Sequence, residues 1–249
     1  MTNWNCVLAD QSTDYLRVLM SLSDSLKRLQ VLLEQMLPVG VESCVDRIKD
    51  GKESFEYPEE EKHLSKAVLK RRNEFIAGRC CARAALARIG VESCALVPDE
   101  NRVPKWPTGI VGSISHSGRL CCAVAAHSDN IAYLGVDIET TTRISRGVIK
   151  RVVHPLEVDF VNDDQARGSL IFSAKEAFFK AQFPTWKAWP NFDDLAFHVD
   201  TSIGQLKVIK IATHLPSGLR AAVEDMQFRY TFFNNYVLTL CWLEKIYTI

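Results

Sequence analysis

The sequence lacks an excess of charge of either sign. Its 249 residues carry 30 Lys and Arg against 30 Asp and Glu, so the formal net charge is zero. Nucleic-acid affinity comes mainly from neutralising phosphates, so this balance predicts that the chain has no nucleic-acid partner. A local basic pocket remains compatible with it.

Long apolar runs and metal-type cysteine spacing are also absent. No stretch approaches the roughly 20 apolar residues of a membrane span, which predicts no stable membrane insertion. Residues 1–5 lack the basic region and apolar run of a secretory signal. The eight cysteines show no Cys-x-x-Cys spacing, which argues against zinc, and most have apolar neighbours, as small buried thiols do. A reducing cytoplasm is therefore the expected location.

The first part of the chain is helical in pattern. Leucines recur at helical spacing over residues 14–37, which predicts a packing helix that ends near Pro38. Pro58, followed by three glutamates, predicts the start of a second helix that runs to Ile89 and ends at Gly90.

From residue 91 onward, short apolar runs between turn residues predict strands. These runs are 95–97, 112–114, 121–126 and 133–138, then 195–199, 205–211, 219–223, 227–233 and 236–242, with helical patterns at 145–153 and 167–182 between the two groups. The order predicts an α+β fold of two similar halves meeting near residue 140. We divide the chain into an N-terminal half, residues 1–139, and a C-terminal half, residues 140–249.

The segment Gly135-Val136-Asp137-Ile138-Glu139 is the first candidate for chemistry. On a strand, Asp137 and Glu139 share one face while the two apolar residues face the core. Two adjacent carboxylates repel each other unless a cation lies between them, and Mg²⁺ binds through few protein oxygens. The pair alone fits two solvated acids at a strand end equally well.

The segment from Phe172 to Lys180 is the second candidate. As a helix it places Glu176 and Lys180 on one stripe, with Lys175 beside them. Such a pair often only stabilises an exposed helix, but flanking phenylalanines predict burial, and buried charges need partners or a metal. A third metal carboxylate and a phosphate-binding lysine would account for these charges.

A Ser-His-Ser-Gly turn at residues 115–118 is the third candidate. Its hydroxyls, imidazole and backbone N–H groups suit an anion, although such a turn also bonds its own backbone. Neighbouring strand residues point apart and no Gly-x-Ser-x-Gly elbow is present, which argues against a serine hydrolase. The fourth candidate is the basic helix around Arg71, Arg72, Arg79 and Arg83, which offers either a phosphate cluster or a solvated face.

Together these segments resemble the phosphopantetheinyl transferases of the surfactin-synthetase-activating class, in the branch of enterobactin synthase component D. The resemblance covers residues 58–182 well and the tail weakly. It is carried by Lys-Arg-Arg-x-Glu-Phe-x-x-Gly-Arg at 70–79, Trp-Pro-x-Gly-x-x-Gly-Ser-Ile-Ser-His-Ser at 106–117, Gly-Val-Asp-Ile-Glu at 135–139 and Phe-Ser-x-Lys-Glu-x-x-x-Lys at 172–180.

The resemblance implies an α+β fold of two similar halves with the active site between them. It implies transfer of the 4′-phosphopantetheine arm of coenzyme A to a serine of an apo carrier protein, with Mg²⁺ as cofactor and release of adenosine 3′,5′-bisphosphate. The branch implies carriers of a siderophore or other non-ribosomal peptide synthetase. One chain would complete the site, so we expect a monomer.

The resemblance also implies roles for single residues. The metal ligands would be Asp137, Glu139, Glu176 and the carbonyl of Ile138. The coenzyme A contacts would be Ser115, His116, Lys175, Lys180, Arg79, Arg102 and one of Arg71 and Arg72. The catalytic residues would be Glu176, as the base for the serine proton, with Lys180 and His116. Two other functions stay open on the sequence: a Mg²⁺-dependent phosphate-handling hydrolase, and a non-catalytic module that binds coenzyme A or a carrier protein.

Overall fold

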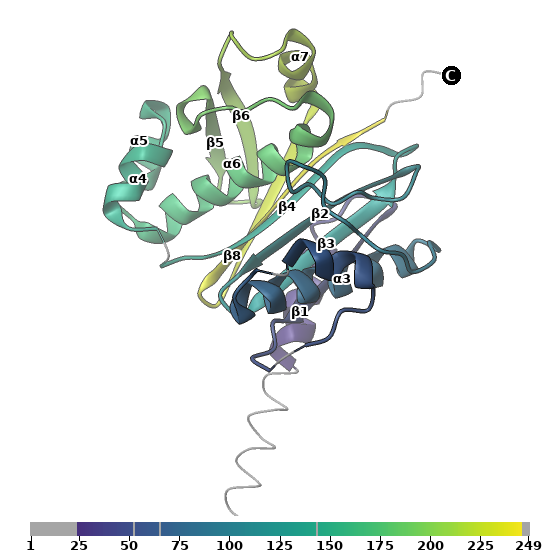
Figure 1. Cartoon of the computed structure of the whole chain (residues 1–249). Helices are drawn as coiled ribbons and strands as arrows, with labels where there is room; N and C mark the ends of the chain where they lie inside the picture. The colour runs from purple at the N-terminus through teal and green to yellow at the C-terminus, as the bar shows by residue number, and fades with distance from the viewer. Residues whose placement is uncertain (1–23, 52, 65, 143, 246–249) are drawn as a thin grey trace, which may run out of the picture.

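The computed structural model describes residues 24–51, 53–64, 66–142 and 144–245. It is an α+β molecule with two antiparallel sheets, each packed against one long helix (Figure 1). The predicted fold class is therefore confirmed. None of the helices in these ranges has the length and apolar character needed to cross a bilayer.

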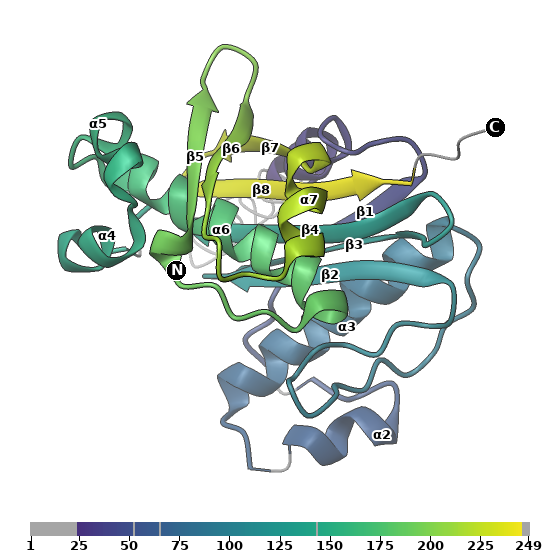
Figure 2. The same ribbon diagram turned by 90° about the horizontal axis from the view of Figure 1, so that it is seen from above.

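The smaller sheet belongs to the N-terminal part. It contains β1 (Val41–Arg47), β2 (Ile110–Ser117) and β3 (Leu120–His127) in the order β1-β3-β2. Helix α3 (Leu69–Arg88) lies against one face of this sheet (Figure 2). Small side chains, among them Ala82 and Ala85 of α3 and Ala123 of β3, form the contact and let the helix approach closely.

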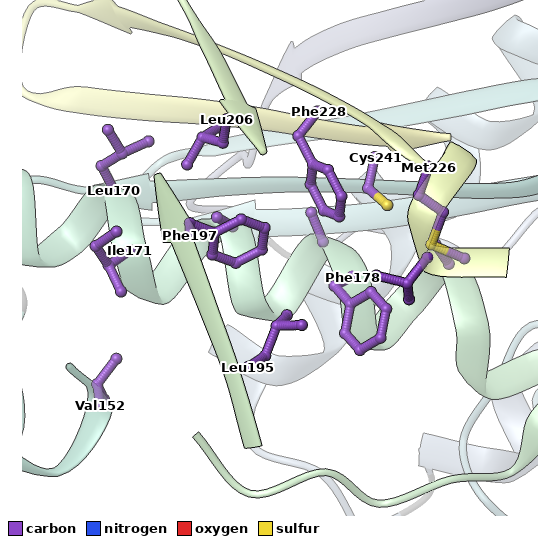
Figure 3. Packing of buried hydrophobic residues seen from close by; sticks show 14 of the residues in the cluster. Val152, Leu170, Ile171, Phe178, Leu195, Phe197, Leu206, Met226, Phe228 and Cys241 are labelled. Atoms are coloured by element: carbon purple, nitrogen blue, oxygen red, sulfur yellow. The ribbon is translucent and has the colours of Figure 1, made fainter. Parts of the chain in front are cut away.

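The larger sheet has the order β4-β8-β7-β6-β5. Its strands are β4 (Ile131–Thr140), β5 (Leu195–Asp200), β6 (Gln205–Ile211), β7 (Gln227–Phe233) and β8 (Tyr236–Glu244). Helix α6 (Gln165–Trp186) packs on it, and Phe178 of α6 lies in the same core as Phe197 and Phe228 (Figure 3). Those last two rings meet edge to face at 4.9 Å. Helices α4 (Arg146–Val152) and α5 (Val158–Val161) pack against α6.

Three serine hydroxyls join the two sheets. The backbone N–H groups of Val136, Ile138 and Thr140 on β4 donate to the hydroxyls of Ser113, Ser115 and Ser117 on β2, over 3.0, 3.2 and 3.3 Å. Each bonded pair is separated by 23 residues in sequence. Because this separation is constant, β2 and β4 run parallel here. We call these three residues the serine ladder, because side-chain oxygens replace the carbonyls of an ordinary sheet.

Gly135 allows α6 to lie directly on β4. A Cβ atom at this position would come within 2.0 Å of the carbonyl oxygen of Ala177 and 2.8 Å of the backbone nitrogen of Ala181. Only a residue without a side chain fits between these backbones. The contact brings the part of α6 that carries Glu176 and Lys180 over the acidic strand.

Several sequence-based boundaries were wrong. The predicted helix 58–89 is broken into α2 (Pro58–Glu61), a 3₁₀ turn (Lys62–Leu64) and α3. In a continuous helix Glu60 and Arg83 would lie about 35 Å apart, whereas the folded-back chain places the Glu60 carboxylate 2.8 Å from the Arg83 guanidinium. The predicted strand 95–97 has no regular secondary structure, because the backbone of Leu96 pairs with the Glu60 and Arg79 side chains rather than with a strand.

The helix predicted at 14–37 falls partly outside the described residues. Residues 14–23 are not described, and residues 24–34 are helical. The run 219–223 was also predicted wrongly, because it belongs to helix α7 (Ser217–Asp225), where Leu219 and Val223 are buried on one face. Its alternation was too short to separate strand from helix.

Candidate active site

Asp137 on β4 is at the centre of the acidic site. Its side chain is buried, and its Oδ1 accepts a hydrogen bond from the Ser115 hydroxyl at 2.8 Å and from the Lys180 ammonium at 2.6 Å. The other oxygen, Oδ2, is buried and has no hydrogen-bond donor within the described ranges. A buried carboxylate oxygen without a donor is costly, which favours a bound cation at this atom.

Glu139 lies two residues further along the same face of β4 and is only 3% exposed. Its Oε1 accepts from the backbone N–H of Thr140 at 2.7 Å and from the hydroxyl of Ser117. The alternation predicted for this strand is present, since Val136 and Ile138 lie in the apolar core. The strand therefore presents two buried carboxylates side by side.

Lys180 extends from α6 to the strand. Its ammonium donates to Asp137, to the Ser115 hydroxyl at 2.9 Å and to the Val136 carbonyl at 3.3 Å. Burial lowers the pKa of Lys180, but the negative charges of Asp137 and Glu176 outweigh that effect and raise the pKa above its ordinary value. Lys180 is thus a fixed positive charge beside the carboxylates.

Glu176 lies one helical turn before Lys180 on α6 and is half-buried. Among the described residues, no three acidic, His or Cys side chains already surround one point as metal ligands. Mg²⁺ nevertheless needs only one or two protein carboxylates and completes its octahedron with water and phosphate oxygens. The strand pair and the donorless Oδ2 of Asp137 fit that requirement, with Glu176 on the adjacent helix.

A basic cavity of about 460 Å³ lies between α3 and the loop 98–104. Among the residues that line it are three arginines and one histidine of the predicted site, namely Arg71, Arg79, Arg102 and His116, together with the carboxylates of Glu74 and Asp99. A larger cavity of about 590 Å³ lies between β6 and α7, and none of the predicted site residues lines it. The basic cavity is therefore the candidate anion site.

His116 is neutral in this cavity. Its Nε2 lies 2.9 Å from Nη1 of Arg71, and a guanidinium only donates, so this nitrogen is an acceptor. Burial and the charges of Arg71 and Lys180 lower the pKa of His116, although Glu74, at 3.9 Å from Nδ1, opposes them. The neutral imidazole holds Arg71 at the cavity.

Arg79 is a buried cation of the cavity wall. Its Nε donates to the Leu96 carbonyl at 2.7 Å, and its guanidinium lies 4.1 Å from the centre of the Phe75 ring. Burial lowers its pKa to about 10, which leaves it protonated at neutral pH. A cation held in this way suits a phosphate group.

Two predicted phosphate ligands point elsewhere. Arg72 contacts Glu61 at 3.1 Å and stacks on Phe55, so Arg71 is the arginine of this pair that lines the cavity. Lys175 donates to Glu157 at 2.8 Å and to the carbonyls of Val152 and Phe192 at 2.8 and 2.6 Å. These three acceptors occupy all the N–H groups of its ammonium. Lys175 therefore holds the interior together, which corrects the expectation that it neutralises phosphate.

The structural roles of Gly135, Ser113 and Ser117 were not predicted from the sequence. Serine at alternating positions 113, 115 and 117 was a usable signal, because it marks one polar face of a strand. A small pocket of about 200 Å³ beside Glu176 was not predicted either; most of its lining is apolar, and four of the lining side chains are aromatic. Its exposed rim is Trp189, which is 68% exposed and contacts Phe179 and Phe183.

Two family models match consecutive parts of the chain. Residues 59–126 match the family model of the 4′-phosphopantetheinyl transferase N-terminal domain, and residues 133–241 match that of the 4′-phosphopantetheinyl transferase superfamily. The two matches together contain the strand carboxylates, α6 and the basic cavity.

Curated relatives extend the likeness. The chain is 36% identical over 173 residues to 4′-phosphopantetheinyl transferase Npt of Nocardia iowensis, which covers 66% of this chain and 74% of that protein. It is 37% identical over 161 residues to 4′-phosphopantetheinyl transferase Svp of Streptomyces mobaraensis, covering 62% and 65%. It is 31% identical over 189 residues to enterobactin synthase component D of Salmonella typhi, covering 71% and 74%. The chain belongs to the 4′-phosphopantetheinyl transferase superfamily and is an enzyme of that kind.

Proposed function

We propose that this transferase uses Mg²⁺ to move the 4′-phosphopantetheine arm of coenzyme A onto a serine hydroxyl of an apo carrier protein, with release of adenosine 3′,5′-bisphosphate. One observation carries the proposal. Ser115 contacts Asp137 and Lys180, while the next residue, His116, lines the basic cavity. Successive side chains of a strand point to opposite faces, so β2 contributes to an acidic centre on one face and to an anion site on the other. Coenzyme A has a diphosphate for the first and a 3′-phosphate for the second.

Each phosphate then has its own charges. Arg71, Arg79, Arg102 and His116 line a cavity suited to the nucleotide and its 3′-phosphate. Lys180 offsets charge on the diphosphate from its position on Asp137. Asp137 and Glu139 are the primary metal ligands that we propose, with Glu176 and the Ile138 carbonyl as further candidates. Mg²⁺, when bound there, supplies a positive charge that offsets the charge growing on the diphosphate.

Glu176 is the proposed acceptor of the carrier serine proton. It is the acid of the site that lies on α6 rather than on the strand, and it borders the small aromatic pocket. That pocket suits the narrow, largely uncharged pantetheine arm. The arm would then lie on the Glu176 side of the diphosphate, while the nucleotide occupies the basic cavity.

Both proposed halves, residues 1–139 and 140–249, contribute to this site, since β2 and α3 lie in the first and α6 in the second. One chain therefore supplies every group named, and we propose a monomer acting in the cytoplasm. The likeness to enterobactin synthase component D supports carriers of siderophore synthetases as partners. Other carriers of peptide or fatty-acid synthesis are tested alongside them.

The test incubates the chain with coenzyme A, Mg²⁺ and apo carrier proteins from these pathways, and follows carrier mass. We expect a gain of one phosphopantetheine group on the carrier serine and none after chelation of the metal. A carrier whose serine is replaced by alanine is the matched control. Release of free phosphopantetheine without a carrier would instead identify a hydrolase, and coenzyme A binding without any turnover would identify a binding module.

A further inference from the structure

Three cysteines from three separate elements meet beneath α3, away from the carboxylates. The sulfur of Cys81 on α3 lies 3.3 Å from that of Cys121 on β3. Cys44 on β1 packs against the same apolar cluster as these two residues, and its pKa responds to the Cys81 thiol. Cys44 on β1 is paired with Ala123 on β3, and Ala123 lies two residues from Cys121. Cys44 and Cys121 therefore lie on the same face of the sheet, the face that α3 covers. We call these residues the thiol cluster.

The members of the thiol cluster differ in access. Cys81 and Cys121 are buried, at 1% and 0% exposed, whereas Cys44 is partly exposed. A small reagent in solution therefore reaches Cys44 first. The two buried sulfurs lie behind it, in contact with each other.

The members also differ in acidity. A hydrogen bond from Cys81 lowers the pKa of Cys44, and the charge of Arg88 adds to this effect against burial and Asp46. The pKa of Cys81 is raised by its contacts with Cys121 and Cys44 and by burial. Of the two thiols, Cys44 therefore loses its proton at the lower pH. A partly exposed thiol with a lowered pKa, close to other thiols, is the arrangement of peroxide-sensitive cysteines.

Simple packing does not account for this arrangement. Cys122 and Cys241 are fully buried in apolar surroundings, and burial raises the pKa of each. Those two behave as small apolar side chains. The thiol cluster instead joins a partly exposed sulfur to two buried ones.

We propose that Cys44, Cys81 and Cys121 form an oxidation site that takes hydrogen peroxide or a small organic hydroperoxide. The Cys44 thiolate attacks one peroxide oxygen, the O–O bond breaks, and the departing oxygen takes a proton and leaves as water or an alcohol. Cys44 is then a sulfenic acid. The Cys81 sulfur attacks the Cys44 sulfur, the S–O bond breaks, and the Cys81 proton leaves with the hydroxyl as water. The peroxide is reduced and two thiols become one disulfide.

Cys121 extends the reaction into the core. Its sulfur contacts that of Cys81, so thiol–disulfide exchange transfers the bond to the Cys81–Cys121 pair and returns Cys44 to the thiol state. Either disulfide fixes α3 to the sheet. Helix α3 also carries Arg71 and Arg79. The disulfide would therefore attach to the sheet the same helix that lines the basic cavity.

The test treats the full, reduced chain with hydrogen peroxide, alkylates the remaining thiols and maps linked peptides by mass spectrometry. We expect the loss of two alkylatable thiols, reversed by dithiothreitol, and a linkage of Cys81 with Cys44 or Cys121. Cys44→Ala should slow this loss at least tenfold. In Cys81→Ala, dimedone should label Cys44 as the sulfenic acid.

Cys80→Ala is the matched control. Cys80 is exposed and adjacent to Cys81, yet the proposal gives it no part, so this variant should oxidise at the wild-type rate. Oxidation at an unchanged rate in Cys44→Ala, or a linkage map centred on Cys80, would overturn the proposal. So would wild-type protein that keeps all its thiols. These outcomes do not depend on transferase activity, and the wild-type linkage map decides the question even if Cys81→Ala does not fold.

Discussion

The ammonium of Lys180 lies 2.6 Å from Oδ1 of Asp137, although the two residues are on a helix and a strand from different parts of the chain. The close approach of α6 to Gly135 makes this contact possible. The proposed metal ligand is therefore already paired with a cation on one oxygen, while its second oxygen has no hydrogen-bond donor in the part of the chain that the structure describes. This relationship defines the first prediction.

Asp137→Asn should lower turnover by about 100-fold or more, because it removes the charge that holds Lys180 and, in our proposal, the metal. Turnover with an apo carrier protein and binding of Mn²⁺, followed by electron paramagnetic resonance, are the measurements. Asp159→Asn, at an exposed position on α5, is the control and should match wild type. Unchanged Mn²⁺ affinity in Asp137→Asn would exclude this residue as a ligand.

Arg71→Ala should raise the KM for coenzyme A about tenfold or more, since a charge-assisted hydrogen bond to phosphate contributes about 1.5–3 kcal/mol. Arg72→Ala should leave KM nearly unchanged, because its guanidinium is turned to Glu61 and Phe55. Steady-state kinetics with varied coenzyme A measure both. The reverse ranking would show that the cavity has been assigned to the wrong arginine.

Lys175→Met should destabilise the fold by about 3–5 kcal/mol without a specific effect on coenzyme A binding, because it leaves the buried Glu157 without its cation. Chemical denaturation measures this cost, and Lys150→Met on the exposed face of α4 is the control. The double variant Lys175→Met with Glu157→Gln should recover part of the loss. A stable single variant with a raised KM would restore the phosphate role to Lys175.

Gly135→Ala should cost about 1–3 kcal/mol of stability and reduce turnover, because the added methyl group forces α6 away from β4. Gly51→Ala is the matched control, since a Cβ there meets no heavy atom within 4 Å. Denaturant midpoints and turnover should change together in Gly135→Ala. Equal midpoints for the two variants would contradict the close contact.

The pKa of His116 should make stability depend on pH. Its folded-state pKa lies below the ordinary 6.5, so the unfolded chain binds the proton more tightly. The contribution is fully present above about pH 6.5 and is lost as pH falls from there through the folded-state pKa. His116→Gln, which keeps a polar side chain without titrating, should lose less stability over this interval. Denaturation at several pH values measures the difference, and identical pH profiles would contradict the assignment.

The common orientation of Asp137 and Glu139 could be predicted from the sequence, because residues two apart on a strand share one face. Adjacent helix positions such as Lys175 and Glu176 were harder. Their side chains diverge by about 100°, and the acceptors of Lys175 come from Val152, Glu157 and Phe192. These partners lie 17 to 23 residues away in sequence, so no local pattern could reveal which lysine turns inward.

The break in the predicted helix after Pro58 could not be predicted either, because it also depends on residues that are distant in sequence. Its glutamates and the later arginines look like two ordinary charged helix faces, and only the tertiary contact between Glu60 and Arg83 shows that the chain folds back. The path of Leu96, whose backbone bonds to two charged side chains, follows from that contact.

The serine ladder has a consequence for how the site responds to a ligand. A peptide ladder separates only when backbone bonds break, whereas a hydroxyl changes partner by rotating about a single bond. Ser115 and Ser117 each touch both the β4 backbone and a carboxylate. Rotation of one hydroxyl therefore changes the hydrogen bonding of Asp137 or Glu139, while the other hydrogen bonds of the serine ladder stay in place. In the function that we propose, the acidic centre would therefore adapt to an incoming phosphate without the two sheets having to separate.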